Sequence, residues 1–364
     1  MENIIVLYGG KSVEHDISII TALQAIENLD KQKYNIYKIY ITKQGELISP
    51  TSATKPQDYI TEINKYKKVK FCFGKGIVSI GAKKIKIDCI LNCMHGTNGE
   101  DGVASALARL LPCPITCPDV MSSAVCMDKV IMKDIMRANN LLCVDYISFF
   151  KHEYQNNETK IITNAEKLGY PLIVKPANLG SSIGIEVAKT REELDYAISV
   201  ALNYDNKIIV EKCLTEMIEI NCACLGNSLC CETSLLEKPS SWNEFLDFKD
   251  KYISNQKAQN NRFDFSLDEN IEQQIHQITQ KAYNVFGCSG VIRIDFMIDS
   301  KNNIYINELN TVPGSLAFYL FKHKYSYRQL LDKIIELSKQ DYNNKQLNIY
   351  TFNSDVLQKN KGFK

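Results

Sequence analysis

The sequence predicts a mixed α/β protein with more than one domain, and three observations support this fold class. The chain has 364 residues, which suits two or three domains rather than one ordinary core. Near its start, an apolar strand, a glycine turn, an amphipathic helix and a second strand follow one another, in the order of a parallel α/β unit. Nearer its end, two apolar strands flank the sequence DSKNN, which indicates an antiparallel hairpin.

Hydrophobic periodicity predicts the elements of the first third of the chain. A buried strand is followed by the sequence GGKS and an amphipathic helix, and lysine-rich hairpin strands lead to another buried strand and a short helix. The expected elements are strand 3–8, helix 14–29, strand 34–42, hairpin strands within 67–88, strand 89–96 and helix 103–111.

The later elements alternate in the same way. The expected elements are helix 127–140, two strands around a glycine-rich turn within 170–188, helix 191–203, strand 207–214, further strands within 216–236, helix 269–287, hairpin strands 291–298 and 304–310, and helix 327–340. Residues 237–266 lose all periodicity, and a loop of this length is usually functional or mobile. The last twenty residues are polar, and we expect them to be loosely held.

Composition excludes several classes of protein. A formal net charge of +1 gives no global signal for nucleic acid or a membrane surface. No apolar run approaches the roughly 18 residues of a membrane span, and the N-terminus reads as a buried strand rather than a signal peptide. The 13 cysteines include no pair of CxxC units, so we expect reduced, mostly buried thiols in a cytoplasmic protein.

The hairpin near residue 300 carries the first candidate site. Arg293 and Asp295 share one face by strand periodicity, and so do Glu308 and Asn310. Carboxylate and amide oxygens on paired strands can hold Mg²⁺, with phosphate oxygens completing its shell. The alternative is a cross-strand ion pair of Arg293 with Asp295 or Glu308. The hairpin by itself leaves both interpretations open.

Other motifs are weaker when taken singly. The sequence VKPANLGSSIG, residues 174–184, brings glycines and serines after Lys175, so that backbone N–H groups could approach an anion; an ordinary hairpin turn explains it equally well. Lys129 opens a helix, as many solvated lysines do. Glu14 follows a Gly-Gly turn and could hold a cationic amine or simply favour the helix dipole. His95 ends a strand, where most histidines are structural.

The order of these motifs is more specific than any one of them. GGxSxEH, HGxxGEDG, MDK, VKP with GSSxG, RxDF and NExNTxPG follow one another in a series that resembles the D-alanine–D-alanine ligases of the ATP-grasp superfamily over residues 1–340. The resemblance implies a three-domain ATP-grasp fold. Its expected parts are an N-terminal α/β domain at 1–118, a central ATP-grasp subdomain at 119–212, a C-terminal subdomain at 213–345 and a polar tail at 346–364.

The resemblance also implies the residues that bind ATP and metal. Lys129 and Lys175 would neutralise nucleotide phosphates, and Glu219 would bind the ribose, although its segment is one residue longer than the family pattern. The other implied nucleotide-binding residues are Ser182 in the glycine-rich loop, Glu211 and Leu214 at the adenine, and Lys251 at the γ-phosphate. The implied ligands of two Mg²⁺ ions, which Mn²⁺ could replace, are Asp295, Glu308 and Asn310.

The implied chemistry is the ATP-dependent joining of two D-alanines through an acyl phosphate, for peptidoglycan precursors. Arg293 and the backbone N–H of Gly314 would stabilise the tetrahedral oxyanion. The groups implied for the first substrate are Glu14 at its ammonium, His95 beside it, and Ser181 and Tyr252 in a hydrogen-bonded set with Glu14. Tyr252 and Lys251 belong to a stretch that resembles the mobile ω-loop of the family, which would act as a lid.

One segment departs from the family pattern. After Gly314 the family places a serine that binds the second D-alanine, but here Tyr319 takes that position and Leu320 follows. We expect a reshaped second-substrate site whose acceptor could be D-alanine, D-serine, D-lactate or another amine. A catalytically silent nucleotide-binding relative is the alternative from another class. The family also suggests a homodimer whose small-molecule partners are ATP and D-alanine, without nucleic acid or membrane.

Overall fold

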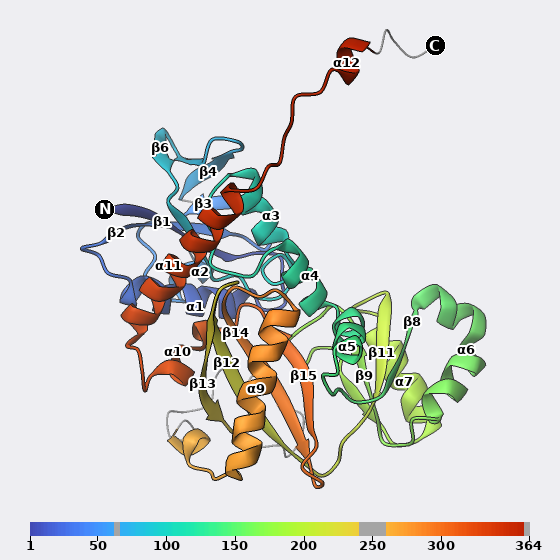
Figure 1. The fold of residues 1–364 in the computed structure, drawn as a ribbon. Helices are drawn as coiled ribbons and strands as arrows, with labels where there is room; N and C mark the ends of the chain where they lie inside the picture. The colour runs from blue at the N-terminus through green and yellow to red at the C-terminus, as the bar shows by residue number, and fades with distance from the viewer. Residues whose placement is uncertain (62–65, 240–259, 360–364) are drawn as a thin grey trace.

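Three sheets organise the chain, and each is covered by its own helices (Figure 1). The computed structural model describes residues 1–61, 66–239 and 260–359. Mixed α/β architecture is therefore confirmed. The exact domain boundaries remain a prediction, because helices from one part of the sequence pack on sheets from another, as the core clusters below show.

The first sheet has seven strands in the order β6-β5-β4-β3-β2-β1-β7. Its strands are β1 (Glu2–Gly9), β2 (Tyr34–Ile41), β3 (Leu47–Ser49), β4 (Lys67–Cys72), β5 (Ile77–Ile80), β6 (Lys83–Lys86) and β7 (Cys89–Asn92). β1 pairs in parallel with β2 and β7, which confirms the parallel unit predicted from the first forty residues. The other strands extend the sheet in antiparallel pairs.

Helices from both ends of the chain pack around this sheet. They are α1 (His15–Asn28), α2 (Asp58–Thr61), α3 (Val103–Leu110) and α11 (Tyr327–Gln346). Ile4 and Val6 of β1 share one hydrophobic cluster with Leu330 and Ile334 of α11, so the last long helix belongs to the N-terminal core. The short α12 (Val356–Lys359) follows an exposed stretch that leads away from the body (Figure 1).

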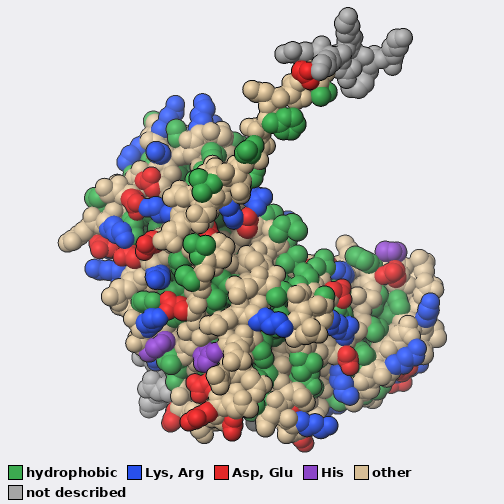
Figure 2. Space-filling view, in the orientation of Figure 1, with side chains coloured by type: hydrophobic (Ala, Val, Ile, Leu, Met, Phe, Trp, Pro, Cys, Tyr) green, Lys and Arg blue, Asp and Glu red, His purple; other side chains and the backbone are tan. Residues whose placement is uncertain are grey.

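The second sheet is antiparallel, with strand order β10-β9-β11-β8. It consists of β8 (Tyr146–Phe150), β9 (Leu172–Pro176), β10 (Glu186–Ala188) and β11 (Lys207–Lys212). The helices α6 (Lys151–Glu166) and α7 (Arg191–Ala201) bury their apolar faces on it. In Figure 2 this sheet and its helices form a lobe separated from the N-terminal body by a concave outline.

The third sheet has the order β13-β12-β14-β15. Its strands are β12 (Met217–Gly226), β13 (Cys231–Glu237), β14 (Gly290–Asp299) and β15 (Ile304–Asn310). One side packs on α9 (Glu269–Val285), and α4 (Val120–Met127) and α5 (Lys129–Ala138) contribute to the same cluster. The remaining short elements are η2 (Asn260–Phe263), η3 (Gly314–Ala317) and α10 (Phe318–Phe321).

The structure corrects the sequence reading at two places: one predicted helix is two helices, and one helix was not predicted. The helix expected over 127–140 is two helices, because Asp128 ends α4 and caps α5 by accepting hydrogen bonds from the N–H groups of Val130 and Ile131. An N-cap carboxylate of this kind breaks one helix and starts the next. The sequence reading also missed α6, whose polar sequence KHEYQNNETK shows little helical periodicity.

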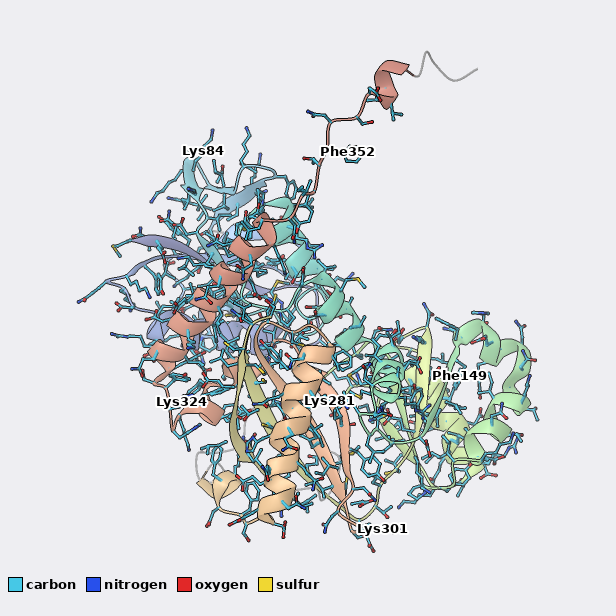
Figure 3. The ribbon with its side chains drawn as sticks, in the orientation of Figure 1. Lys84, Phe149, Lys281, Lys301, Lys324 and Phe352 are labelled. Atoms are coloured by element: carbon cyan, nitrogen blue, oxygen red, sulfur yellow. The ribbon has the colours of Figure 1, made fainter. Side chains whose placement is uncertain are left out.

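The predicted hairpin is confirmed as the antiparallel pair β14–β15. Asp295 pairs with Glu308, and Arg293 pairs with Asn310. A bulge follows Asp295 in the register. The hairpin turn, marked by Lys301 in Figure 3, lies at the opposite end of the strands from these four residues. The residues predicted to share a site therefore meet at the far end of the hairpin.

The expectation of mostly buried thiols that form no disulfide is confirmed. All 13 cysteines lie in described parts of the chain, where none forms a disulfide and nine are buried. Among the described helices, none has the length and apolarity that a bilayer crossing requires.

Candidate active site

One hollow collects residues from four distant parts of the chain. Lys129 at the start of α5, Gly180 in the glycine-rich loop, and Glu308 and Asn310 at the end of β15 all line it. Glu100, in the loop between β7 and α3, also contributes. Motifs that are separate in the sequence, and weak when taken singly, thus meet at one site between all three sheets.

Glu14 lies against the glycine-rich loop. The hydroxyl of Ser181 donates a hydrogen bond to Oε1 of Glu14. Oε2 is buried and has no hydrogen-bond partner among the described residues. A buried carboxylate oxygen without a donor is costly, so a ligand with a cationic amine would satisfy it. Glu14 and Ser181 therefore form the pair that the sequence predicted.

Glycines surround the free oxygen of Glu14. A β-carbon at Gly96 would lie 2.4 Å from Oε2, and one at Gly180 would lie 3.2 Å from it. Gly96 also has a φ of +62°, a conformation that side chains other than glycine rarely adopt. Both glycines therefore keep the space at the carboxylate open.

His95 is buried and connects the loop after β7 with the turn after β15. Its Nδ1 lies 2.7 Å from the carbonyl oxygen of Val312, and its Nε2 lies 2.8 Å from Oγ1 of Thr21. Burial lowers the pKa of His95, but the carboxylates of Glu100 and Glu14 and the carbonyl of Val312 raise it by more. His95 is thus held in a fixed orientation beside Glu14, and its role in placing substrate stays a prediction.

Glu100 lies near Glu14 and His95 and also near Glu308 at the end of β15. Its Oε1 lies 3.5 Å from Nδ1 of His95. Burial raises the pKa of Glu100, and the charges of Glu14 and Glu308 raise it further, while His95 acts in the opposite direction. The sequence reading did not single out Glu100, although it lies in the motif HGxxGEDG that was used to identify His95.

The predicted phosphate lysines both point into buried polar surroundings. Nζ of Lys129 donates a 2.6 Å hydrogen bond to the carbonyl oxygen of Leu179 in the glycine-rich loop. Nζ of Lys175 donates to Oε2 of Glu211 at 2.7 Å and to Oδ1 of Asn307 at 3.3 Å. Burial lowers the pKa of Lys129, opposed chiefly by the carboxylate of Glu308. Buried ammonium groups at a glycine-rich loop suit an anionic ligand.

Besides Lys175, a second lysine approaches the carboxylate of Glu211. Nζ of Lys133, which is 0% exposed, lies 3.2 Å from Oε1 of Glu211. Burial raises the pKa of Glu211, but Lys133 and Lys175 outweigh burial and bring the pKa down to about 2. The sequence reading missed Lys133. The available signal was its position four residues after Lys129, on the same side of the helix.

The predicted metal ligands fit a hard cation. Nε and Nη2 of Arg293 donate to the two oxygens of Asp295 at 2.6 and 2.8 Å, and Nδ2 of Asn310 donates to Oδ2 of Asp295 at 3.1 Å. The carboxylate oxygens of Asp295 have further lone pairs that a cation can use. The amide oxygen of Asn310 takes no part in the hydrogen bond that its Nδ2 donates to Asp295. Two carboxylates and an amide match the ligands that Mg²⁺ takes together with phosphate oxygens.

The two interpretations of the hairpin are therefore not exclusive. The ion pair between Arg293 and Asp295 exists, and Asp295 also contacts Asn310, which lines the hollow. Among the described residues, no group of three or more histidine, cysteine, aspartate or glutamate side chains could hold a metal ion. The hairpin set has only two such side chains, so phosphate oxygens would have to complete the metal shell.

The segment after Gly314 differs from a simple turn. Ser315, Leu316 and Ala317 have φ values of 50°, 52° and 52°, in the region that residues with a side chain seldom occupy. Tyr319 follows and brings its hydroxyl beside the guanidinium of Arg293. Burial raises the pKa of Tyr319 to about 12, although Arg293 acts in the opposite direction.

Gly314 and Tyr319 thus lie on the same short segment next to Arg293. A β-carbon on Gly314 would meet no atom within 4 Å, so a ligand can approach the main chain there. The structure brings Arg293 and Tyr319 together, a contact that the sequence reading did not predict. Leu320, by contrast, is fully buried in the N-terminal core.

Five further predicted site residues stay predictions. Leu214 and Glu219 are half-buried near the end of β11 and on β12, and Ser182 lies in the glycine-rich loop with a φ of +57°. Tyr252 and Lys251 lie outside the described residues.

Comparisons with known proteins agree with this geometry. Residues 3–118 match the family model for the D-ala D-ala ligase N-terminus, and residues 135–336 match that for the D-ala D-ala ligase C-terminus. A D-alanine--D-alanine ligase from Thermosipho africanus is 37% identical, over 98% of this chain and 98% of that protein. A D-alanine--D-alanine ligase from Staphylococcus epidermidis is 35% identical, over 96% of this chain and 98% of that protein.

Solved structures resemble the fold over nearly its whole length. The D-alanine-D-alanine ligase from Coxiella burnetii has a TM-score of 0.81 and 28% identity, covering 95% of this chain and 96% of its own. The VanG D-Ala:D-Ser ligase from Enterococcus faecalis has a TM-score of 0.79 and 27% identity, covering 93% of this chain and 99% of its own. The expected ATP-grasp architecture is thereby confirmed.

Proposed function

This chain belongs to the D-alanine–D-alanine ligase family, and from that premise we propose that it joins two D-alanines into D-alanyl-D-alanine, using ATP. The observation that carries the proposal is the open carboxylate oxygen of Glu14. It faces Gly180, which lines the same hollow as Lys129 and Glu308. An ammonium site and a phosphate and metal site thus adjoin, as a reaction between an amino acid and ATP requires.

The first step joins the carboxylate of one D-alanine to the γ-phosphate of ATP. One carboxylate oxygen attacks phosphorus, the bond to the β-phosphate oxygen breaks, and an acyl phosphate and ADP result. Glu14 holds the ammonium of this D-alanine, with Ser181 fixing the carboxylate of Glu14. Lys129 and Lys175 place positive charge at the phosphates, where charge stabilisation is most effective in a site that excludes water.

The second step forms the peptide bond. The amine of the second D-alanine attacks the acyl carbon, a tetrahedral intermediate forms, and inorganic phosphate leaves with the carbon–oxygen bond electrons while the amine loses a proton. The guanidinium of Arg293 and the N–H of Gly314 are the groups suited to the oxyanion. Asp295 accepts two hydrogen bonds from the guanidinium of Arg293 and so holds it in one orientation.

Asp295, Glu308 and Asn310 would hold Mg²⁺. When bound, the metal would neutralise the charge of the phosphates and polarise the transferred phosphoryl group. The chain itself supplies the geometry, because the register of β14 and β15 sets Asp295 opposite Glu308. Two ions are expected, and Mn²⁺ is an expected substitute.

A second candidate activity uses another acceptor. The hydroxyl of Tyr319 sits beside Arg293, where the family pattern has a serine, and a phenol fills much more space. A reshaped pocket favours an acceptor with a different side chain, such as D-serine, or D-lactate with a hydroxyl nucleophile. The structural similarity to the VanG D-Ala:D-Ser ligase gives this candidate further support.

The product would serve as a precursor of peptidoglycan, made in the cytoplasm where ATP is available, and a homodimer is the expected assembly. The test of the proposed activity is phosphate release from ATP with Mg²⁺ and D-alanine alone, with mass spectrometry of the product. Phosphate together with D-alanyl-D-alanine supports the main proposal.

Two other outcomes have distinct meanings. Little dipeptide with D-alanine alone, but ligated product after D-serine or D-lactate is added, supports the second candidate. No turnover with any acceptor contradicts both and indicates a silent nucleotide-binding protein.

A further inference from the structure

Three charged side chains meet in the interior near Lys129, on elements distant in the sequence. Glu211 is the last residue but one of β11, Lys175 is the last but one of β9, and Lys133 lies on α5. Nζ of Lys175 lies 2.7 Å from Oε2 of Glu211, and Nζ of Lys133 lies 3.2 Å from Oε1. Lys133 is 0% exposed and Glu211 is 1% exposed. The carboxylate is thus clamped between two ammonium groups in the interior.

Buried lysines with one shared carboxylate are unusual, since burying a charge is unfavourable unless it is paired. One carboxylate neutralises only one of the two lysines, so the cluster keeps one net positive charge. Lys129 adds another ammonium within electrostatic range of Glu211. The other titratable groups that face the carboxylate are the thiols of Cys143 and Cys213, which add no positive charge.

The two lysines differ in their surroundings. Lys175 adjoins Asn307, next to the predicted metal ligand Glu308, and donates a hydrogen bond to each of its two partners. Lys133 lies deeper, and its Nζ forms an ion pair with Oε1 of Glu211 at 3.2 Å. Lys133 therefore supplies charge to the carboxylate from a side that no ligand can reach, while Lys175 faces the site.

We propose that Lys133 is a positioning residue for nucleotide binding, which holds Glu211 in place and compensates its charge so that Lys175 stays available to the nucleotide phosphates. This inference rests on the proposed function for the identity of the ligand. Without Lys133, the remaining pair is neutral, and Lys175 has to stay with Glu211 to avoid leaving a buried carboxylate alone. A phosphate group would then compete with Glu211 for the only remaining ammonium.

The experiment compares ligand affinity in the full-length chain by calorimetric titration. Two ligands are titrated separately. One is ATP with Mg²⁺, and the other is tripolyphosphate, which has three phosphates but no nucleoside. The variant Lys133→Met keeps the length and removes the charge. We expect both dissociation constants to rise by about tenfold or more, because charge-assisted contacts to phosphate are strong. Under steady-state assay the loss should appear in KM for ATP more than in kcat.

A matched control lies one turn further along the same helix. Arg137 is 45% exposed and pairs with Asp145, which is 79% exposed, so Arg137→Met should leave both affinities unchanged. If Lys133 has only a structural role, Lys133→Met will lower the unfolding temperature while the folded protein binds both ligands as tightly as the parent. That result would overturn the inference.

A double-mutant cycle with Glu211→Gln tests the route of the effect. Once the carboxylate is gone, Lys175 is free with or without Lys133. Lys133→Met should therefore change tripolyphosphate affinity by less than about twofold in the Glu211→Gln background. An equally large loss in both backgrounds contradicts the inference. If Lys133→Met alone does not fold, Lys133→Gln, which is also uncharged but polar, replaces it in both backgrounds and is judged by the same criteria.

The outcomes separate this inference from the proposed function. Binding is measured without D-alanine, so a chain that binds ATP but makes no dipeptide contradicts the proposed function alone. A parent chain that binds neither ATP nor tripolyphosphate contradicts both.

Discussion

The regions proposed for the first and second substrates are built in different ways. The first is assembled from three separate elements, which contribute Glu14, His95 and Ser181, and each of these side chains is held by another residue. The second depends on one short segment, residues 314–321, which places Tyr319 beside Arg293. A site fixed from several directions resists change, whereas a site on one segment can be altered by a few substitutions in that segment.

The two regions nevertheless share a helix. Oγ1 of Thr21 on α1 lies 2.8 Å from Nε2 of His95 and accepts a 3.2 Å hydrogen bond from the N–H of Ser315. Gln24, one turn later on α1, accepts a 2.7 Å hydrogen bond from the hydroxyl of Ser315. The unusual backbone after Gly314 is therefore held by the helix that begins directly after Glu14 and contacts His95.

The largest expected effect comes from a residue that serves both regions. Glu308→Gln removes a carboxylate from the metal set, so both dipeptide formation and phosphate release should fall by about 10³-fold. The measurement is turnover with coupled detection of ADP. A loss of less than tenfold would argue against a metal role for Glu308, provided that the unfolding temperature is unchanged.

Glu14→Gln should damage the first region selectively. The amide cannot pair with an ammonium as a charged group, so kcat/KM for the first D-alanine should fall by about 10²-fold. The dissociation constant of ATP should change little. Equal losses of ATP and D-alanine affinity would show that Glu14 does not define a separate first site.

Tyr319→Ser should affect the second region instead. Removing the phenol opens space beside Arg293, and we expect the ratio of D-alanine to D-serine used as acceptor to change by about tenfold. Competition between isotopically labelled acceptors, with mass spectrometry of the products, measures this ratio. Identical acceptor preference and KM in variant and parent would contradict the role of Tyr319.

Thr21→Val tests whether α1 couples the two regions. The substitution keeps the shape and removes the hydroxyl between His95 and Ser315. We expect a several-fold rise, about three to ten, in KM for both D-alanine sites, since one neutral hydrogen bond contributes about 0.5–1.5 kcal/mol. If only one KM changes, the shared contact has no effect on the other region.

The last prediction concerns stability rather than turnover, and it is made at Glu211. The pKa of Glu211 is lowered from 4.5 to about 2, so its ionised form stabilises the folded chain above the unfolded value, and this contribution is lost as the pH falls toward 2. The stability difference between parent and Glu211→Gln should therefore shrink as the pH falls from about 4.5 toward 2. Urea unfolding at several pH values measures it, and a constant difference would contradict the assignment.

Much of the fold could be predicted because its signals are local. Alternating or continuous apolar runs revealed β1, β9, β11 and the β14–β15 hairpin, and helical periodicity revealed α1, α7 and α9. The failures have local causes too. The polar helix α6 has little amphipathic pattern, and the break at Asp128 depends on a side-chain cap within an otherwise continuous helical sequence.

The sequence by itself determined the family and most residue types of the candidate site, because each motif keeps its chemistry within a few adjacent positions. Only the tertiary structure decided how the groups interact. Lys133 and Glu211 are 78 positions apart, and no periodicity predicts their approach across α5 and β11. Nor does any motif predict that Thr21 would join His95 to Ser315. Such contacts follow from the packing of separate elements, which brings distant charges and hydroxyls within hydrogen-bonding range.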